Sequence, residues 1–249
     1  MSPLWLSRKT RLGVCADRIL VAGGKPVPVA QGSDVLEVLS SVLKEKQKHQ
    51  LSIVLADSFV KYMLLPFNPA LKTDDQWLAL ARHRLATVYG AQAAEWEVKL
   101  TATAPQGARL ACAIERSLVA ALAERAVAAR VDLVSVQPFL VAAFNQMRDL
   151  AGAGSCWLVV EEPGRLTLAY LQKSAWIAVR SRRVDAQWRN LLPEIIERES
   201  ACLALNETCT RVIVCAQEGF DTGMHEAFRL DAVSYKAVSY THLTLPTKA

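Results

Sequence analysis

Two pairs of adjacent carboxylates are the residues of this sequence best suited to chemistry. Asp74 and Asp75 stand at the predicted start of a helix, where negative charge interacts favourably with the helix dipole. Glu161 and Glu162 end a predicted strand, just before the turn at residues 163–165. Carboxylates can bind a metal ion or transfer a proton, so the second pair is the candidate functional one.

A basic cluster is the second candidate for function. The segment Arg180-Ser-Arg-Arg follows the apolar alternation of residues 175–179. On a strand, Arg180 and Arg182 share one face because successive side chains alternate. The charges either protect a solvated strand edge from aggregation or contact a partner, and both interpretations stay open. Arg180, Arg182 and Arg183 are therefore candidate partner-binding residues.

Several motifs with a defined chemistry are absent from the sequence. It contains no GxxxxGK[ST] or GxGxxG segment for phosphate, no GxSxG nucleophile turn and no CxxC pair. His49, His83 and His225 are scattered, without the spacing of metal ligands. The six cysteines lie mostly in apolar runs, which is typical of reduced core residues. We therefore expect no metal site.

The composition indicates a folded protein with a mild positive charge. The chain has 249 residues, of which 52% are hydrophobic and 21% charged, enough for one large domain or two lobes. Its 29 basic and 24 acidic residues give a formal net charge of +5. These charges are scattered, whereas nucleic-acid binders concentrate them in a basic stripe. We therefore expect no nucleic-acid partner.

The sequence also predicts a compartment. No uninterrupted apolar run approaches the length of a membrane span. Residues 1–11 do not read as a secretion signal, because their basic residues follow the apolar ones and no long apolar core comes next. With cysteines used as core residues, these features favour the cytosol.

The predicted elements occur in one order twice. Residues 11–56 read as short strands, a helix and a further strand. Residues 156–215 repeat this order as a three-stranded meander, a long helix and a strand. Further strands and helices fill residues 59–150. The sequence therefore predicts a duplicated α/β protein, and not a doubly wound sheet of strict βαβ units.

One segment resembles a known family. The run Trp157-Leu-Val-Val-Glu-Glu-Pro-Gly-Arg-Leu-Thr-Leu-Ala-Tyr-Leu-Gln is similar to the second phosphate-loop meander of actin-like proteins. The most similar of these are the pilus-assembly proteins called PilM, the related MshI and the cytoplasmic part of the secretion protein GspL. Residues 11–24 correspond to the first phosphate loop, and residues 133–138 resemble the passage into the second half. The resemblance implies a duplicated ribonuclease-H-like, actin-like ATPase fold with two lobes.

The resemblance covers most of residues 10–236 and implies a domain organisation. After an N-terminal segment of residues 1–10, residues 11–151 form a first lobe with an inserted α/β subdomain. Residues 152–236 form a second, incomplete lobe. Residues 237–249 look like the translation of a sequencing adapter, so we exclude them and expect the native protein to continue.

Both predicted phosphate loops depart from the family pattern, in which glycine follows an acid. Asp17 is followed by Arg18, and Pro163 stands where the glycine after Glu161 is expected, with Gly164 one position later. Proline has no backbone NH to offer a phosphate. Asp17, Glu161 and Gly164 are therefore degenerate nucleotide-pocket positions. We expect no cofactor, although weak binding of Mg-ATP stays open.

The resemblance implies a non-catalytic cytoplasmic scaffold or adaptor of an MSHA-like type IV pilus machine, peripheral to the inner membrane. Its partner is then the cytoplasmic segment of an inner-membrane pilus or secretion protein, with an assembly motor ATPase as a second possible partner. One alternative is a functional ATPase or small-molecule kinase that uses Asp17 or Glu161 as its metal-side carboxylate. Another is a GspL-like component of type II secretion.

Overall fold

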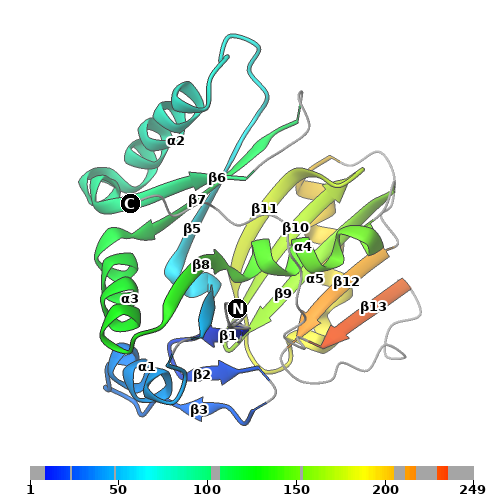
Figure 1. Cartoon of the computed structure of the whole chain (residues 1–249). Coiled ribbons are helices and arrows are strands. Elements are labelled where there is room, and N and C mark those ends of the chain that lie inside the picture. The colour runs from blue at the N-terminus through cyan, green and yellow to red at the C-terminus, as the bar shows by residue number, and fades with distance from the viewer. Residues whose placement is uncertain are drawn as a thin grey trace, which may run out of the picture.

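The computed structural model describes residues 9–22, 24–47, 49–101, 107–151, 154–204, 211–216 and 229–234. The elements form three sheets, which we call the first, second and third sheet (Figure 1). Several expectations from the sequence lie outside the described residues. They concern residues 1–8, Cys209, His225 and the segment 237–249.

The first sheet has five strands and is covered by two helices. Its order is β3-β2-β1-β4-β8, with β1 antiparallel to β2 and parallel to β4, which is parallel to β8. The side chain of Asp34 caps α1 by accepting a hydrogen bond from the NH of Leu36. The elements are β1 (Lys9–Val14), β2 (Arg18–Val21), β3 (Val27–Pro28), α1 (Val35–Lys44), β4 (Gln50–Leu55), α3 (Arg116–Ala128) and β8 (Asp132–Pro138).

The second sheet repeats this order as β11-β10-β9-β12-β13. A meander of three antiparallel strands again continues into two parallel strands, and α5 covers the outer face. The predicted duplication is therefore confirmed, whereas β13 was not predicted. The elements are β9 (Ser155–Glu162), β10 (Arg165–Gln172), β11 (Ala175–Arg183), α5 (Trp188–Cys202), β12 (Arg211–Ala216) and β13 (Arg229–Ser234).

The third sheet is inserted between β4 and α3. Its order is β5-β7-β6, all antiparallel, and α2 packs on one face through Trp77, Ala81 and Leu85. Thr73 and Gln76 form a reciprocal capping box at the start of α2. The elements are η1 (Asp57–Phe59), β5 (Val60–Leu65), α2 (Asp74–Tyr89), η2 (Gly90–Glu95), β6 (Trp96–Leu100) and β7 (Arg109–Glu115).

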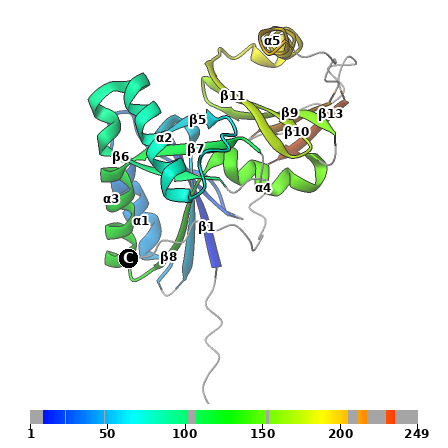
Figure 2. The same cartoon turned by 90° about the horizontal axis from the view of Figure 1, so that it is seen from above.

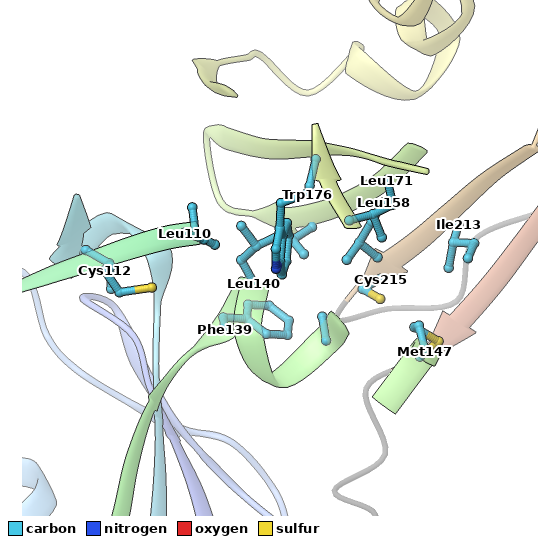
Figure 3. Close-up of a cluster of buried hydrophobic side chains, with 14 of the residues drawn as sticks. Leu110, Cys112, Phe139, Leu140, Met147, Leu158, Leu171, Trp176, Ile213 and Cys215 are labelled. Carbon is cyan, nitrogen blue, oxygen red and sulfur yellow. The ribbon is translucent and has the colours of Figure 1, made fainter. Parts of the chain in front are cut away.

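The helix α4 (Phe139–Ala151) lies between the first and second sheets (Figure 2). Its buried residues pack in one hydrophobic core with buried residues of all three sheets (Figure 3). We call this the inter-lobe core. Trp176 is 2% exposed there and lies 4.5 Å from the ring of Phe144. This apolar contact fixes how the lobes sit against each other. None of the helices in the described part of the chain is long and apolar enough to cross a membrane.

Candidate functional site: a buried carboxyl cluster between the lobes

The carboxyl ends of three parallel strands meet at one edge of the first sheet. There β1, β4 and β8 end side by side, which is the position where open α/β sheets bind ligands. The chain leaves β4 into η1, whose first residue is Asp57, and leaves β8 directly into α4. From the second lobe, the last residue of β9, Glu162, reaches the same place.

One hydrogen bond joins the two lobes here, and two more hold Asp57 to β5 and α4 of its own lobe. The backbone NH of Asp57 donates to Oε1 of Glu162 at 2.7 Å. Oδ1 of Asp57 accepts from the backbone NH of Leu140 at 3.0 Å and from the hydroxyl of Tyr62 at 2.5 Å. Asp57 and Glu162 are only 1% and 5% exposed. We call Asp57, Tyr62, Glu162 and Thr167 the inter-lobe carboxyl cluster.

One oxygen of each carboxyl in this cluster and the Thr167 hydroxyl have no hydrogen-bond partner. Oδ2 of Asp57, Oε2 of Glu162 and Oγ1 of Thr167 are buried without a hydrogen-bond partner. The Thr167 hydroxyl lies close enough to Asp57 to lower its pKa, yet outside hydrogen-bonding geometry. Buried unsatisfied polar atoms cost free energy, and ionised ones cost more. Burial of these oxygens therefore favours a protonated carboxyl in the cluster.

The pKa values agree with this reading. Burial, together with the nearby charge of Asp57, raises the pKa of Glu162 to about 8, against the opposing effect of backbone NH groups and Arg165. Burial also raises the pKa of Asp57, while the bonds from Tyr62 and Leu140 oppose the shift. Burial next to Asp57 raises the pKa of Tyr62 well above its usual value, so its hydroxyl remains a donor.

The structure places Asp17 in a local turn, apart from this cluster. Its carboxylate binds Nε and Nη2 of the adjacent Arg18, at 3.0 and 2.7 Å, and is half exposed. The NH of Cys15 closes the turn on the carbonyl of Arg18. The first predicted phosphate loop is thus a tight hairpin whose acid and one amide donor already have partners.

Glu161 and Glu162 point to opposite faces of the second sheet. Glu161 lies on the α5 side, with Oε2 4.0 Å from the guanidinium of Arg189, while Glu162 reaches the cluster. Gly164 serves the turn after Pro163, because its φ of +71° suits glycine. Glu161 was the predicted pocket position, but the contact across the lobes belongs to Glu162.

Sequence reasoning missed Asp57 altogether. A signal for it does exist, because the acid directly follows the apolar strand β4, where a parallel strand presents its carboxyl end. Tyr62 and Thr167 carry no comparable signal, since each lies inside a strand and belongs to no recognisable motif.

The three predicted partner-binding arginines do not share one surface. Arg180 and Arg182 pair in register with Leu168 and Leu166, on the face of β11 that α5 covers, whereas Arg183 lies on the other face. Nη1 of Arg182 binds Oε1 of Glu199 on α5 at 2.9 Å, which gives it a structural role. Arg180 and Arg183 are exposed.

The residues present fit Mg-ATP poorly. Pro163 offers no amide donor, and the carboxylate of Glu162 already accepts the NH of Asp57. Asp17 is paired with Arg18. Within the described residues, no three His, Cys, Asp or Glu side chains gather as a metal site. We therefore derive no chemistry that passes through a nucleotide.

Comparison with known proteins supports the fold. The sequence matches no family model, and no curated protein matches it significantly. A chain of the PilM–PilN type IV pilus biogenesis complex is 12% identical, with a TM-score of 0.62 over 91% of this chain and 88% of that one. A Bacteroides thetaiotaomicron protein with an actin-like ATPase fold and unknown function is 9% identical, with a TM-score of 0.59 over 90% and 88%.

The cytoplasmic domain of EpsL, an inner-membrane component of the type II secretion system of Vibrio cholerae, is also similar. It is 13% identical, with a TM-score of 0.55 over 95% of this chain and 89% of that domain. At such identities the likeness concerns the fold alone. Together with the repeated sheet order, it shows that this chain has the actin-like ATPase fold.

Proposed function

We propose that this protein is a non-catalytic, cytoplasmic actin-like adaptor of a type IV pilus biogenesis machine. It binds the cytoplasmic segment of an inner-membrane pilus protein and lies peripheral to that membrane. The fold shared with a chain of the PilM–PilN complex and with the EpsL domain supports an assembly role. The mild positive charge is compatible with work beside an anionic membrane surface.

The inter-lobe carboxyl cluster is the main support for a non-catalytic role. It joins Asp57 of the first lobe to Glu162 of the second at the edge where an actin-like enzyme is expected to hold phosphate. An enzyme of this class needs free carboxylates and amide donors there. In this chain the buried carboxyl of Glu162 binds the backbone of the other lobe, the carboxyl of Asp57 binds Tyr62 and Leu140, and Pro163 removes a donor.

Calorimetric titration with Mg-ATP tests this part. We expect no binding at micromolar nucleotide. Micromolar affinity together with turnover that disappears in Asp17→Asn or Glu161→Gln would establish the rival ATPase or kinase. Binding without turnover would leave an adaptor that senses nucleotide.

A mutational test of the proposed partner-binding arginines must leave the ion pair between Arg182 and Glu199 intact. Reversing all three arginines places a new acid beside Glu199 and damages the packing of α5. Arg180→Glu with Arg183→Glu changes only exposed charges. We expect this double variant to lose pull-down of the cytoplasmic segment of the pilus membrane protein encoded beside this gene. Arg182→Gln is the control for stability alone, and unchanged binding by the double variant would dismiss the arginines.

The gene neighbourhood separates this proposal from a GspL-like role. Neighbouring genes for membrane-anchored pilus components support the pilus adaptor and its MSHA-like subtype. Genes for type II secretion in the same place support the role of the EpsL type instead, on the same fold.

A further inference from the structure

Two carboxyl groups from different lobes are buried at one contact. The backbone NH of Asp57 donates to Oε1 of Glu162 at 2.7 Å, which places Glu162 against the residue that carries the other carboxyl. Oδ2 of Asp57 and Oε2 of Glu162 are both buried without a hydrogen-bond partner. Two like charges close together and away from water repel each other strongly, so ionising both groups carries a high cost in free energy.

In the part of the chain that the structure describes, the groups that act on this pair come from every element packed around it. They are the NH of Ser58 in η1, Tyr62 of β5, Cys112 of β7, the NH of Leu140 in α4, and Arg165 and Thr167 of β10. Arg165 is the cation among them and favours ionisation of both carboxyls. Its Nη1, however, donates to Oγ of Ser181 at 3.0 Å, and its guanidinium is partly exposed. Solvent therefore weakens its effect on the buried pair.

The pair loses its proton at a mildly alkaline pH. Burial and the nearby charge of Asp57 raise the pKa of Glu162 to about 8, and burial raises the pKa of Asp57 as well. Because the two groups interact, the proton belongs to the pair and not to one residue. The hydroxyl of Tyr62 and the thiol of Cys112 stay protonated in this range, since burial raises their pKa values further. Above pH 8, two negative charges therefore face each other across the lobe contact.

We propose that Asp57 and Glu162 hold one proton between them, and that loss of this proton releases η1 from the end of β9. This edge of the lobe contact then opens and admits water, which solvates both carboxylates. The inter-lobe core keeps the lobes attached, and Leu140, whose NH donates to Asp57, packs in that core (Figure 3). The opening does not depend on the proposed adaptor role, so either proposal can fail while the other stands.

Native-state hydrogen exchange at pH 6 and pH 9, followed by mass spectrometry, tests the opening. After correction for intrinsic exchange rates, protection of the amides of η1 should fall at least tenfold between the two pH values. The amides of β6 in the third sheet should keep their protection, which separates a local opening from a loss of global stability. Glu162→Gln has no proton to lose at this position and should keep η1 protected at both pH values. Glu161→Gln, on the adjacent residue that faces α5, is the matched control and should respond like the wild type.

Infrared spectroscopy tests the proton itself, because the carbonyl stretch of a protonated carboxyl is separate from the bands of a carboxylate. The wild type should show this stretch at pH 7 and lose it by pH 9, and Glu162→Gln should show no such change. The proposal is overturned if the wild type lacks the stretch at pH 7 or keeps η1 equally protected at both pH values. An equal loss of protection in Glu162→Gln, or in β6, would overturn it as well. The wild-type measurements decide the question even if Glu162→Gln does not fold.

Discussion

The backbone NH of Asp57 and the carboxylate of Glu162 meet at 2.7 Å although the two residues are 105 positions apart in the chain. The bond connects the end of β4 in the first lobe with the end of β9 in the second. Since both residues are buried, water does not weaken the bond, and the NH of Asp57 depends on Glu162 for its acceptor. Four predictions follow from this contact and from the core and cysteines around it.

Glu162→Gln should flatten the pH dependence of stability. The folded state raises the pKa of Glu162 from 4.5 to about 8, so the contribution of this group to stability is fully present below pH 4.5 and is lost as the pH rises towards 8. The loss is at most about 1.4 kcal/mol per pH unit for one proton. Glutamine cannot ionise but keeps an acceptor oxygen for the Asp57 NH. Urea unfolding between pH 5 and 8 measures how the free energy of unfolding changes with pH in the wild type and in Glu162→Gln.

The control for this experiment is Glu97→Gln, which removes a partly exposed carboxylate paired with Lys99 at 3.2 Å. It should retain the wild-type slope. Parallel curves for wild type and Glu162→Gln would show that Glu162 is ionised throughout this range.

Asp57→Ala should destabilise the protein by about 3 kcal/mol. The change leaves the NH of Leu140 and the hydroxyl of Tyr62 buried without an acceptor, at about 1–3 kcal/mol for each group. Tyr62→Phe removes one of these bonds and should cost about 1.5 kcal/mol. Chemical denaturation at pH 6 measures both. Asp132→Ala, at an exposed position, should stay within about 0.5 kcal/mol, and an equally small effect at Asp57 would refute the role given to it.

Trp176→Ala should cost about 4 kcal/mol, because it opens a cavity where the three sheets meet. The lost packing against Phe144 adds to the lost burial. We expect the two lobes to lose stability together, seen as a single shifted unfolding transition. Val127→Ala, at a position 76% exposed, is the control. Two separate transitions in Trp176→Ala would mean that the lobes fold independently once this contact is weakened.

Cysteine labelling should single out Cys202 among the described cysteines. It is exposed on α5, whereas Cys15, Cys112, Cys156 and Cys215 are buried. Burial raises the pKa of Cys215 to about 12 and that of Cys112 further still, so neither forms the reactive thiolate. Mass spectrometry after brief iodoacetamide treatment at pH 7.5 measures this. Modification of Cys112 or Cys215 in the native state would contradict the packing between the lobes.

The local elements were predictable because their signals are local. Thr73 and Asp34 cap α2 and α1 as the sequence suggests, and Gly90 ends α2 with a φ of +74°. The long helix of the second half, α5, begins only at Trp188, since the Asp185 side chain first binds the NH of Gln187 in a turn. Boundaries of this kind depend on such single hydrogen bonds.

The candidate site was less predictable because its contacts are not local. Sequence alone identifies Glu161 and Glu162 together, and only the strand register decides which of them faces the other lobe. Asp57 becomes significant only when β9 is placed next to the end of β4, across 105 residues. The resemblance to actin-like proteins supplied the two-lobed arrangement but pointed to the phosphate loops, and Asp57 lies in neither.

Pro163 has a consequence for any attempt to engineer this chain. Exchanging it for glycine restores one amide in the turn, yet Glu162 stays engaged by Asp57, and Asp17 stays engaged by Arg18. If the protein is the non-catalytic adaptor proposed above, conversion into a triphosphate-hydrolysing protein requires concerted remodelling of three separated segments. On that proposal, a library of single substitutions should contain no member that gains this activity.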